Sequence, residues 1–124
     1  MPPAVMTNLH VLSKGSSKYG PLIGAIDQGT SSSRFLIFSS RTLELITYHQ
    51  IEVRQICPHE GWMEEDPVHL LKTVIQCMSE VWSKLTDMKI DPHDVFAIGL
   101  TNQRESTIVW DKNTGKPYHN AICK

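Results

Sequence analysis

The segment Ile26-Asp27-Gln28-Gly29-Thr30-Ser31-Ser32-Ser33-Arg34 stands between two short apolar runs, Leu22 to Ile26 and Phe35 to Phe38. Runs of this length, joined by Gly and small polar residues, predict two antiparallel strands connected by a tight turn. The turn contains a carboxylate, a glycine, four consecutive hydroxyl side chains and an arginine within nine residues. It is therefore the most chemically distinctive segment of the chain.

The side chains of this turn have the chemistry of a phosphate and metal site. Hydroxyls and backbone amides donate hydrogen bonds to phosphate oxygens, and Arg34 adds charge-assisted ones. Asp27, at the end of the first strand, can hold a hydrated Mg2+, which prefers one or two carboxylates together with phosphate oxygens and water. The alternative is an ordinary turn, because Ser and Thr are common in turns for local reasons. A Walker A loop is excluded, since its G-x-x-x-x-G-K-[ST] pattern is absent.

Composition predicts one globular domain. The chain has 124 residues and is 40% hydrophobic and 20% charged, which argues against disorder. Its formal net charge of -1 gives no basic field for nucleic acid. No apolar run approaches the roughly 18 residues that a membrane span needs, so we expect neither a nucleic-acid partner nor a span.

The cysteines and histidines predict neither disulfides nor zinc. Cys57, Cys77 and Cys123 are widely spaced and form no C-x-x-C pair, which is typical of free thiols in a reducing compartment. None of the six histidines has ligand spacing beside a cysteine. We therefore expect a cytoplasmic protein without a zinc site.

Residues 1–20 are predicted to be a flexible leader, since they combine prolines, glycines and serines with no acidic residue. Their apolar pieces are short, and the basic residues Lys14 and Lys18 come late, which argues against a secretory signal peptide. A mitochondrial targeting segment is the remaining alternative, and the lack of arginine disfavours it.

A strand and a loop are predicted after the hairpin. Leu43 to Val53 alternates apolar and polar residues, which predicts a third strand with one solvent face and completes an antiparallel meander. In the loop from Pro58 to Glu65, Trp62 is expected to plug the space beneath the loop. The alternative for Trp62 is an aromatic wall beside a ligand.

Asp66 and Pro67 predict the start of a helix, with Asp66 as its N-cap. The helix is expected to end before Asp91-Pro92. Apolar residues at three- and four-residue steps form one stripe that should cover a face of the sheet. The stripe consists of Leu71, Val74, Ile75, Met78, Val81, Trp82 and Leu85.

Two strands are predicted after the helix. Val95 to Leu100 is expected to be a buried strand, and Ser106 to Trp110 a further strand that ends in a turn at Asp111 to Gly115. The order β-β-β-α-β-β predicts an α/β domain with a mixed sheet.

A second polar cluster, Asn102-Gln103-Arg104-Glu105, follows the Val95–Leu100 strand at its carboxyl end, where open α/β sheets bind ligands. Both clusters are therefore expected to face one cleft. Arg104 would donate hydrogen bonds to the hydroxyl oxygens of a neutral polyol, and Glu105 would accept them from its hydroxyl hydrogens. The alternative is a solvated turn in which the two charges compensate each other.

Together these segments resemble those of glycerol kinases, which belong to the FGGY sugar-kinase branch of the actin-like ATPase superfamily. The resemblance covers Pro21 to Ile122 and implies a ribonuclease H-like, actin-like ATPase domain. Related pentulose and hexulose kinases are expected to share the Asp-x-Gly-Thr hairpin but not the full N-Q-R-E string, which favours glycerol. The matching segments are Asp27 to Arg34, Gly61 to Pro67, Ile98 to Thr107, Val109 to Pro117 and Asn120 to Ile122.

The resemblance also implies roles for individual residues. Asp27 matches the position that orders Mg2+, and Arg104 and Glu105 match positions that bind the glycerol hydroxyls. The implied reaction uses ATP and Mg2+, moves the terminal phosphoryl group to a primary hydroxyl of glycerol and gives sn-glycerol 3-phosphate. The positions that contact the nucleotide phosphates correspond to Thr30, Ser31, Ser32 and Arg34.

The resemblance breaks off at the end of the chain. After Asn-Ala-Ile the family continues with Val-Trp, and that Trp lines the glycerol pocket, whereas Cys123-Lys124 stand here. The family's general base and adenine-binding residues also lie beyond Lys124. Residues 21–124 are thus expected to be a truncated N-terminal domain that holds no catalytic base, is inactive alone, exposes apolar surface and self-associates. The alternatives are a non-catalytic isoform that binds or regulates a full-length kinase, and a fragment of a kinase for another polyol.

Overall fold

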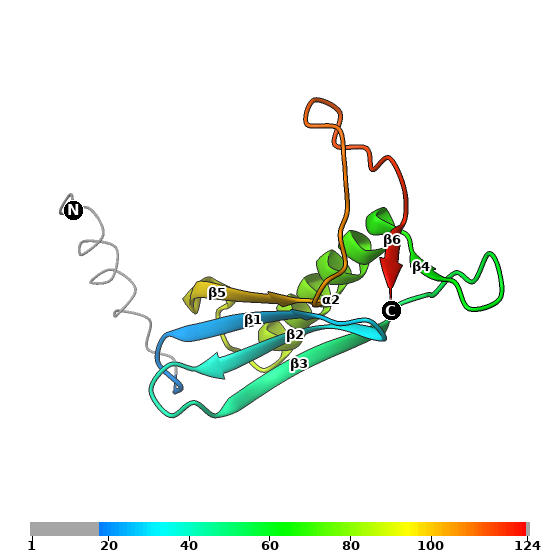
Figure 1. Cartoon of the computed structure of the whole chain (residues 1–124). Helices are drawn as coiled ribbons and strands as arrows, with labels where there is room; N and C mark the ends of the chain where they lie inside the picture. The colour runs from blue at the N-terminus through cyan, green and yellow to red at the C-terminus, as the bar shows by residue number, and fades with distance from the viewer. Residues whose placement is uncertain (1–17, 124) are drawn as a thin grey trace.

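The computed structural model describes residues 18–123 (Figure 1). Residues 1–17 of the predicted leader lie outside the described residues. Of its last residues, Tyr19 packs against the core, and its carbonyl oxygen accepts a hydrogen bond from Ser39 Oγ at 2.8 Å. The elements are β1 Leu22–Gln28, β2 Ser32–Ser39, β3 Leu45–Glu52, β4 Met63–Glu65, α2 Pro67–Asp87, the 3-10 helix η1 Pro92–Asp94, β5 Val95–Asn102 and β6 Ala121–Cys123.

A four-stranded mixed sheet with the order β3-β2-β1-β5 forms the centre of the fold (Figure 1). β1 and β2 are antiparallel, β3 continues antiparallel to β2, and β5 lies parallel to β1. The predicted hairpin, meander and mixed α/β sheet are therefore confirmed. In the register, Asp27 lies between Arg34 of β2 and Thr101 of β5. A second sheet pairs β4 with β6.

Helix α2 packs on one face of the sheet, over β2 and β3. It begins as predicted, because the Asp66 carboxylate accepts a hydrogen bond from Val68 N–H and Pro67 occupies the first turn. Between helix and sheet lies the hydrophobic core. Its buried residues are Leu22, Phe35, Ile37, Cys77, Val81, Leu85 and Ile90.

The buried face of α2 is rotated relative to the predicted stripe. Leu71, Ile75 and Trp82 of that stripe are exposed, so the prediction was wrong for these residues. The apolar surface of the helix is wider than the strip that touches the sheet, and the pattern alone does not show which part of it is covered. The buried residues of α2 are Leu70, Thr73, Cys77, Val81 and Leu85.

The segment after β5 also departs from the prediction. Ser106 to Trp110 is not a strand, and its only ladder contact within the described residues is an isolated bridge between Trp110 and Pro117. An alternating pattern forms a strand only beside another strand, and this mostly exposed segment lies beside none. The last strand is β6, so the strand and helix order is β-β-β-β-α-β-β. The predicted turn closes with a hydrogen bond from Gly115 N–H to the Asp111 carbonyl oxygen at 2.8 Å.

β5 and Trp62 are more exposed than predicted. Phe96, Ile98 and Leu100 of β5 are 38%, 48% and 70% exposed, because β5 is an edge strand and α2 packs over β2 and β3 instead. Trp62 is 58% exposed and contacts the His59 ring edge-on, with 4.8 Å between ring centroids, instead of plugging the loop. For β5, the apolar run therefore predicted the strand correctly but did not predict how exposed its side chains are.

Candidate functional site

The hairpin turn leaves three of its four hydroxyl side chains accessible and buries the fourth. Gly29 N–H donates a hydrogen bond to the Ser32 carbonyl oxygen at 2.8 Å, which places Thr30 and Ser31 at the tip. Ser31 is exposed, and Thr30 and Ser32 are half-buried. Ser33 is fully buried beneath α2. The hydroxyls that remain available for a phosphate are those of Thr30, Ser31 and Ser32.

Asp27 and Arg34 face each other on the side of the hairpin opposite α2. Because side chains alternate along β2 and Phe35 points into the core, Arg34 points away from it. Arg34 Nη2 donates to Asp27 Oδ2 at 2.6 Å, and the two side chains are 44% and 33% exposed. An ion pair this exposed contributes about 1 kcal/mol or less. Both groups are therefore ordered, yet little energy is needed to separate them.

The second polar cluster meets the hairpin through Gln103. Gln103 Nε2 lies 3.1 Å from the Gly29 carbonyl oxygen and 3.0 Å from Gln28 Oε1. Asn102 pairs with Gln28 in the parallel ladder. The carboxyl ends of β1 and β5 thus lie together, and the chain enters Arg104 directly from this contact.

Arg104 and Glu105 are exposed in the loop after β5. Glu105 has a φ of 65°, in the left-handed region, which costs a non-glycine residue about 1–3 kcal/mol. Glu105 lines a hollow that combines polar and apolar side chains, as ligand sites commonly do, whereas Arg104 is not among the residues that line it. The other lining residues are Thr107, Val109, His119, Asn120, Ile122 and Cys123.

A polar chain of side chains, three of them buried, connects the two clusters and was not predicted from the sequence. Glu65 is fully buried, and its Oε1 has no hydrogen-bond partner within the described residues. Burial raises the pKa of the nearby Cys123 thiol, and the charge of Glu65 raises it further. The one signal in the sequence was the run Glu64-Glu65-Asp66, which contains more carboxylates than an N-cap needs. The chain consists of Glu65, Gln103, Gln28, Ser33 and Thr73.

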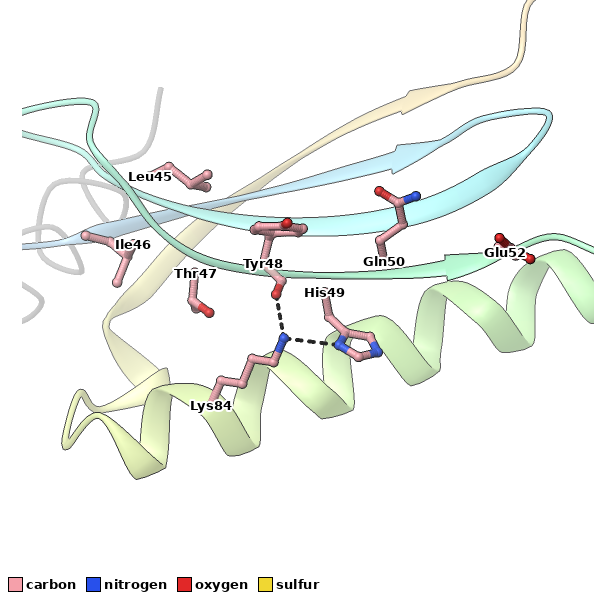
Figure 2. Close-up of a pocket in the computed structure, with 8 residues that line it drawn as sticks. All are labelled: Leu45, Ile46, Thr47, Tyr48, His49, Gln50, Glu52 and Lys84. Carbon is pink, nitrogen blue, oxygen red and sulfur yellow. Dashed lines mark hydrogen bonds between the residues drawn. The ribbon is translucent and has the colours of Figure 1, made fainter.

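A separate hollow lies along the free edge of β3 (Figure 2). Lys84 of α2 reaches into it, donating to the Tyr48 carbonyl oxygen at 2.7 Å and lying 3.1 Å from His49 Nδ1. A lysine across an edge strand hinders pairing with another chain. The hollow contains none of the predicted site residues, and edge protection accounts for Lys84. Its lining residues are Leu45, Ile46, Thr47, Tyr48, His49, Gln50, Glu52 and Lys84.

Over residues 18–123, no three His, Cys, Asp or Glu side chains gather closely enough to hold a metal ion among them. The site predicted at Asp27 has a single carboxylate, and a hydrated Mg2+ needs only one or two. Within the same span, no helix is sufficiently long and apolar to cross a bilayer. Cys57, Cys77 and Cys123 are free thiols.

Comparison with known proteins connects this geometry to one family. Residues 22–124 match the N-terminal domain of the FGGY family of carbohydrate kinases. A probable glycerol kinase of Caenorhabditis elegans is 56% identical over 101 residues, which cover 82% of this chain and 20% of the relative. A glycerol kinase of Fusobacterium nucleatum is 49% identical over 100 residues, which cover 81% and 19%. The chain thus spans about a fifth of the length of these relatives.

Solved structures agree with the fold. The crystal structure of Plasmodium falciparum glycerol kinase with ADP superposes with a TM-score of 0.75 at 34% identity and covers 82% of this chain and 20% of that chain. A xylulose kinase from Lactobacillus acidophilus, with a TM-score of 0.68 at 21% identity, covers 82% and 19% and shares the fold. The expected sugar-kinase fold of the actin-like ATPase type is confirmed. The chain belongs to the FGGY family of carbohydrate kinases.

Proposed function

We propose that this chain is the N-terminal part of a glycerol kinase, with ATP as phosphoryl donor and glycerol as acceptor. The reaction transfers the terminal phosphoryl group of ATP to a primary hydroxyl and yields sn-glycerol 3-phosphate. The observation that carries this proposal is the contact between Gln103 and the Gly29 carbonyl oxygen, because it joins the phosphate-type hairpin to the polyol-type turn. The identity of 46–56% to proteins named glycerol kinase supports glycerol as the polyol.

In this proposal the hairpin tip binds the nucleotide phosphates through Thr30, Ser31, Ser32 and Arg34. Phosphoryl transfer depends mainly on positioning and on neutralising negative charge spread over the phosphate oxygens. Arg34 supplies positive charge there, and it can leave Asp27 at low cost because their ion pair is exposed.

Asp27 is the residue proposed to hold Mg2+. Its carboxylate is partly exposed near the end of β1, three residues before Thr30 of the tip, which suits an ion that keeps several waters. Mg2+, when bound, neutralises phosphate charge. Separation of the Arg34 guanidinium from Asp27 Oδ2 would free both groups for their ligands.

Arg104 and Glu105 are proposed to orient glycerol. Arg104 would donate hydrogen bonds to hydroxyl oxygens, and Glu105 would accept them from hydroxyl hydrogens. Their role is to hold a primary hydroxyl toward the hairpin tip. No residue of the chain is assigned as general base, so we expect no turnover by the chain alone.

Titration of the 15N-labelled chain with MgADP and with glycerol, followed by NMR, tests the proposal. MgADP is expected to shift the amide signals of Gly29 to Arg34, and glycerol those of Arg104 to Ser106. Arg34→Gln should weaken MgADP binding by about tenfold, because it removes a charge-assisted contact. Arg41→Gln, in the turn at the other end of β2, is the matched control and should leave the affinity unchanged.

Binding of neither ligand would contradict the proposal, and so would equal effects of Arg34→Gln and Arg41→Gln. A longer polyol that binds more tightly than glycerol would instead assign the chain to a kinase for that polyol. Measurable turnover of ATP and glycerol by the chain alone would overturn the expectation that a base is lacking.

A second candidate is a chain that acts by associating with another kinase chain or with itself. The exposed apolar side chains of β5, Phe96, Ile98 and Leu100, favour it, since apolar edge strands are prone to pairing. Sedimentation velocity of the chain alone, and mixed with a full-length glycerol kinase, tests this function. A monomer that neither binds the kinase nor changes its rate would exclude it.

A further inference from the structure

The Gln103 side chain holds three parts of the molecule together. Its Nε2 lies 2.7 Å from Glu65 Oε2, 3.0 Å from Gln28 Oε1 and 3.1 Å from the Gly29 carbonyl oxygen. Its Oε1 accepts a hydrogen bond from Ser106 Oγ at 2.8 Å. One amide thus connects β4, the start of the hairpin turn and the loop that carries Arg104 and Glu105.

The same chain of hydrogen bonds continues to helix α2. Gln28 Nε2 donates to Ser33 Oγ at 3.3 Å, and Ser33 Oγ lies 2.8 Å from Thr73 Oγ1. Thr73 Oγ1 donates to the Leu70 carbonyl oxygen at 2.7 Å, so the Ser33 hydroxyl is the donor to Thr73. Ser33 and Thr73 are 0% and 2% exposed, so water cannot readily replace these partners.

The orientation of the Gln103 amide is determined by its neighbours. Nε2 carries two hydrogens and faces three acceptors, and the shortest contact is to a carboxylate. A flipped amide would place Oε1 against the Glu65 carboxylate, oxygen to oxygen. Glu65 is fully buried with Oε1 unpartnered, which is costly for stability alone. The contact with Gln103 explains why a carboxylate is buried at this position, because its Oε2 accepts a hydrogen bond from the Gln103 amide.

We propose that Gln103 is a positioning residue that couples the phosphate hairpin to the Arg104–Glu105 turn, and that Glu65 fixes the direction of its amide. The inference rests on the proposed function and deepens it, because it makes the nucleotide and glycerol sites energetically dependent on each other. A shift of the Gly29 carbonyl group moves Gln103, and Arg104 is the next residue of the chain. By linkage, each ligand then raises the affinity for the other by the same factor.

The first experiment uses amide hydrogen exchange and NMR shifts of the 124-residue chain without ligand. Gln103→Met, which keeps the size and removes the donor, should accelerate exchange at both Gly29 and Arg104–Ser106 more than in the core strands. Glu65→Leu should have the same effect. Glu65→Gln is the conservative variant and should stay close to wild type, because its amide oxygen can still accept from Gln103. Gln76→Met on the exposed side of α2 is the matched control and should change neither segment.

The second experiment measures MgADP affinity with and without saturating glycerol. In the wild-type chain glycerol should tighten MgADP binding by roughly fivefold, and this factor should fall to about one in Gln103→Met. Glu65→Gln should restore the coupling that Glu65→Leu removes. A purely structural role of Gln103 would lower stability without changing the coupling factor in the folded fraction.

The outcomes separate the inference from the proposed function. If Gln103→Met perturbs exchange uniformly, as a general loss of stability would, the inference is wrong whether or not the chain binds ligands. If the hairpin and the turn loosen together but wild type binds neither ligand, the proposed function fails and the mechanical coupling stands. If both ligands bind and the coupling factor survives Gln103→Met, the inference fails and the proposed function stands.

Discussion

The hairpin half of the molecule, residues 22–90, and the C-terminal segment, residues 95–123, contain similar apolar stretches in different environments. Phe35 and Ile37 of β2 are 5% and 0% exposed, whereas Ile98 and Leu100 of β5 are 48% and 70% exposed. Both pairs of residues lie in the same sheet. The difference comes from the position of α2, which packs over β2 and β3. β5 lies at the edge of the sheet, away from these two strands, and is covered less (Figure 1).

This contrast shows that an apolar strand is buried by its neighbours and not by its own composition. The same distinction applies to the two polar clusters. The hairpin tip projects from a packed core, whereas Arg104 and Glu105 belong to a loop whose connection to that core runs through Gln103. Stability should therefore be concentrated in the hairpin half, and ligand-dependent ordering in the C-terminal segment.

The largest expected effect compares one isoleucine from each part. Ile37→Ala should lower the free energy of unfolding by about 2–4 kcal/mol, because it leaves a cavity in the core. Ile98→Ala should cost about 1 kcal/mol or less, since half of that side chain is already in water. Urea denaturation of the two variants gives both numbers. Equal losses would mean that β5 is covered in solution, for example by self-association, which repeating the measurement at several protein concentrations would reveal.

A second comparison separates the hydroxyls of the hairpin. Ser33→Ala should cost about 1–3 kcal/mol of stability, because Thr73 Oγ1 and Gln28 Nε2 lose a buried partner. Ser31→Ala should change stability by less than about 0.5 kcal/mol, since its side chain is exposed. If the proposed function is right, Ser31→Ala weakens MgADP binding and Ser33→Ala leaves the affinity of the folded protein unchanged. The reverse pattern would show that the buried hydroxyl, not the exposed one, meets the phosphates.

The sequence predicted the β1–β2 hairpin and the start of α2 well because their signals are local. Gly29 between two apolar runs indicates the turn, and Asp66-Pro67 indicates the start of the helix, whatever surrounds them. Four predictions were wrong because each depends on which segment packs beside the residues, and a local pattern does not show this. They are the burial of β5, the buried face of α2, the plug formed by Trp62 and the strand at Ser106–Trp110.

The polar chain through Glu65 and Gln103 was missed for a related reason. Nothing in the spacing of Glu65 and Gln103 shows that they meet. The parallel pairing of β1 with β5 brings Gln103 beside Gln28 and Gly29, whereas Glu65 reaches it from β4, a strand of the other sheet. Alternation along β2 could have identified Ser33 as the inward hydroxyl, since it is two residues before the core residue Phe35. The roles of the site residues remain predictions, for which the titrations above are the tests.

A third comparison concerns two residues in the left-handed region, one in each part. Lys89, with a φ of 59°, ends α2, where Ile90 N–H donates to the Leu85 carbonyl oxygen and Lys89 N–H to that of Thr86. Lys89→Gly should therefore stabilise the protein by about 1 kcal/mol in thermal or urea unfolding. Glu105→Gly should gain less, because Glu105 lies in an exposed loop of the C-terminal segment, where relief of backbone strain contributes less to global stability. A larger gain in stability for Glu105→Gly than for Lys89→Gly would show that the Arg104–Glu105 turn is as tightly coupled to global folding as the end of α2.

The smallest expected effect concerns two buried thiols, Cys77 in the hairpin half and Cys123 in the C-terminal segment, and the pH dependence of stability that they cause. Burial raises the pKa of the Cys77 thiol above its ordinary value of 9.0, and burial followed by the charge of Glu65 raises that of Cys123. Because both pKa values are higher in the folded state, the resulting stabilisation is present below the ordinary value and is lost as the pH rises through the folded values. Unfolding free energy should therefore decline slightly above about pH 9, and less so in a Cys77→Ala/Cys123→Ala variant.

Alkylation by iodoacetamide at pH 8 resolves the two thiols individually, with the exposed Cys57 as an internal reference. Cys77 lies in the core and should react only through global unfolding, so its rate should follow the denaturant dependence of stability. Cys123 lies in β6, which pairs with β4 through three residues, and should react through local opening, at a rate that low denaturant hardly changes. Glu65→Gln should accelerate Cys123 and leave Cys77 unchanged, because only Cys123 feels that charge. The alkylation rate of Cys123 could instead follow global unfolding. The C-terminal segment would then be as stable as the hairpin half, and its exposed apolar residues would not indicate a separate unit of stability.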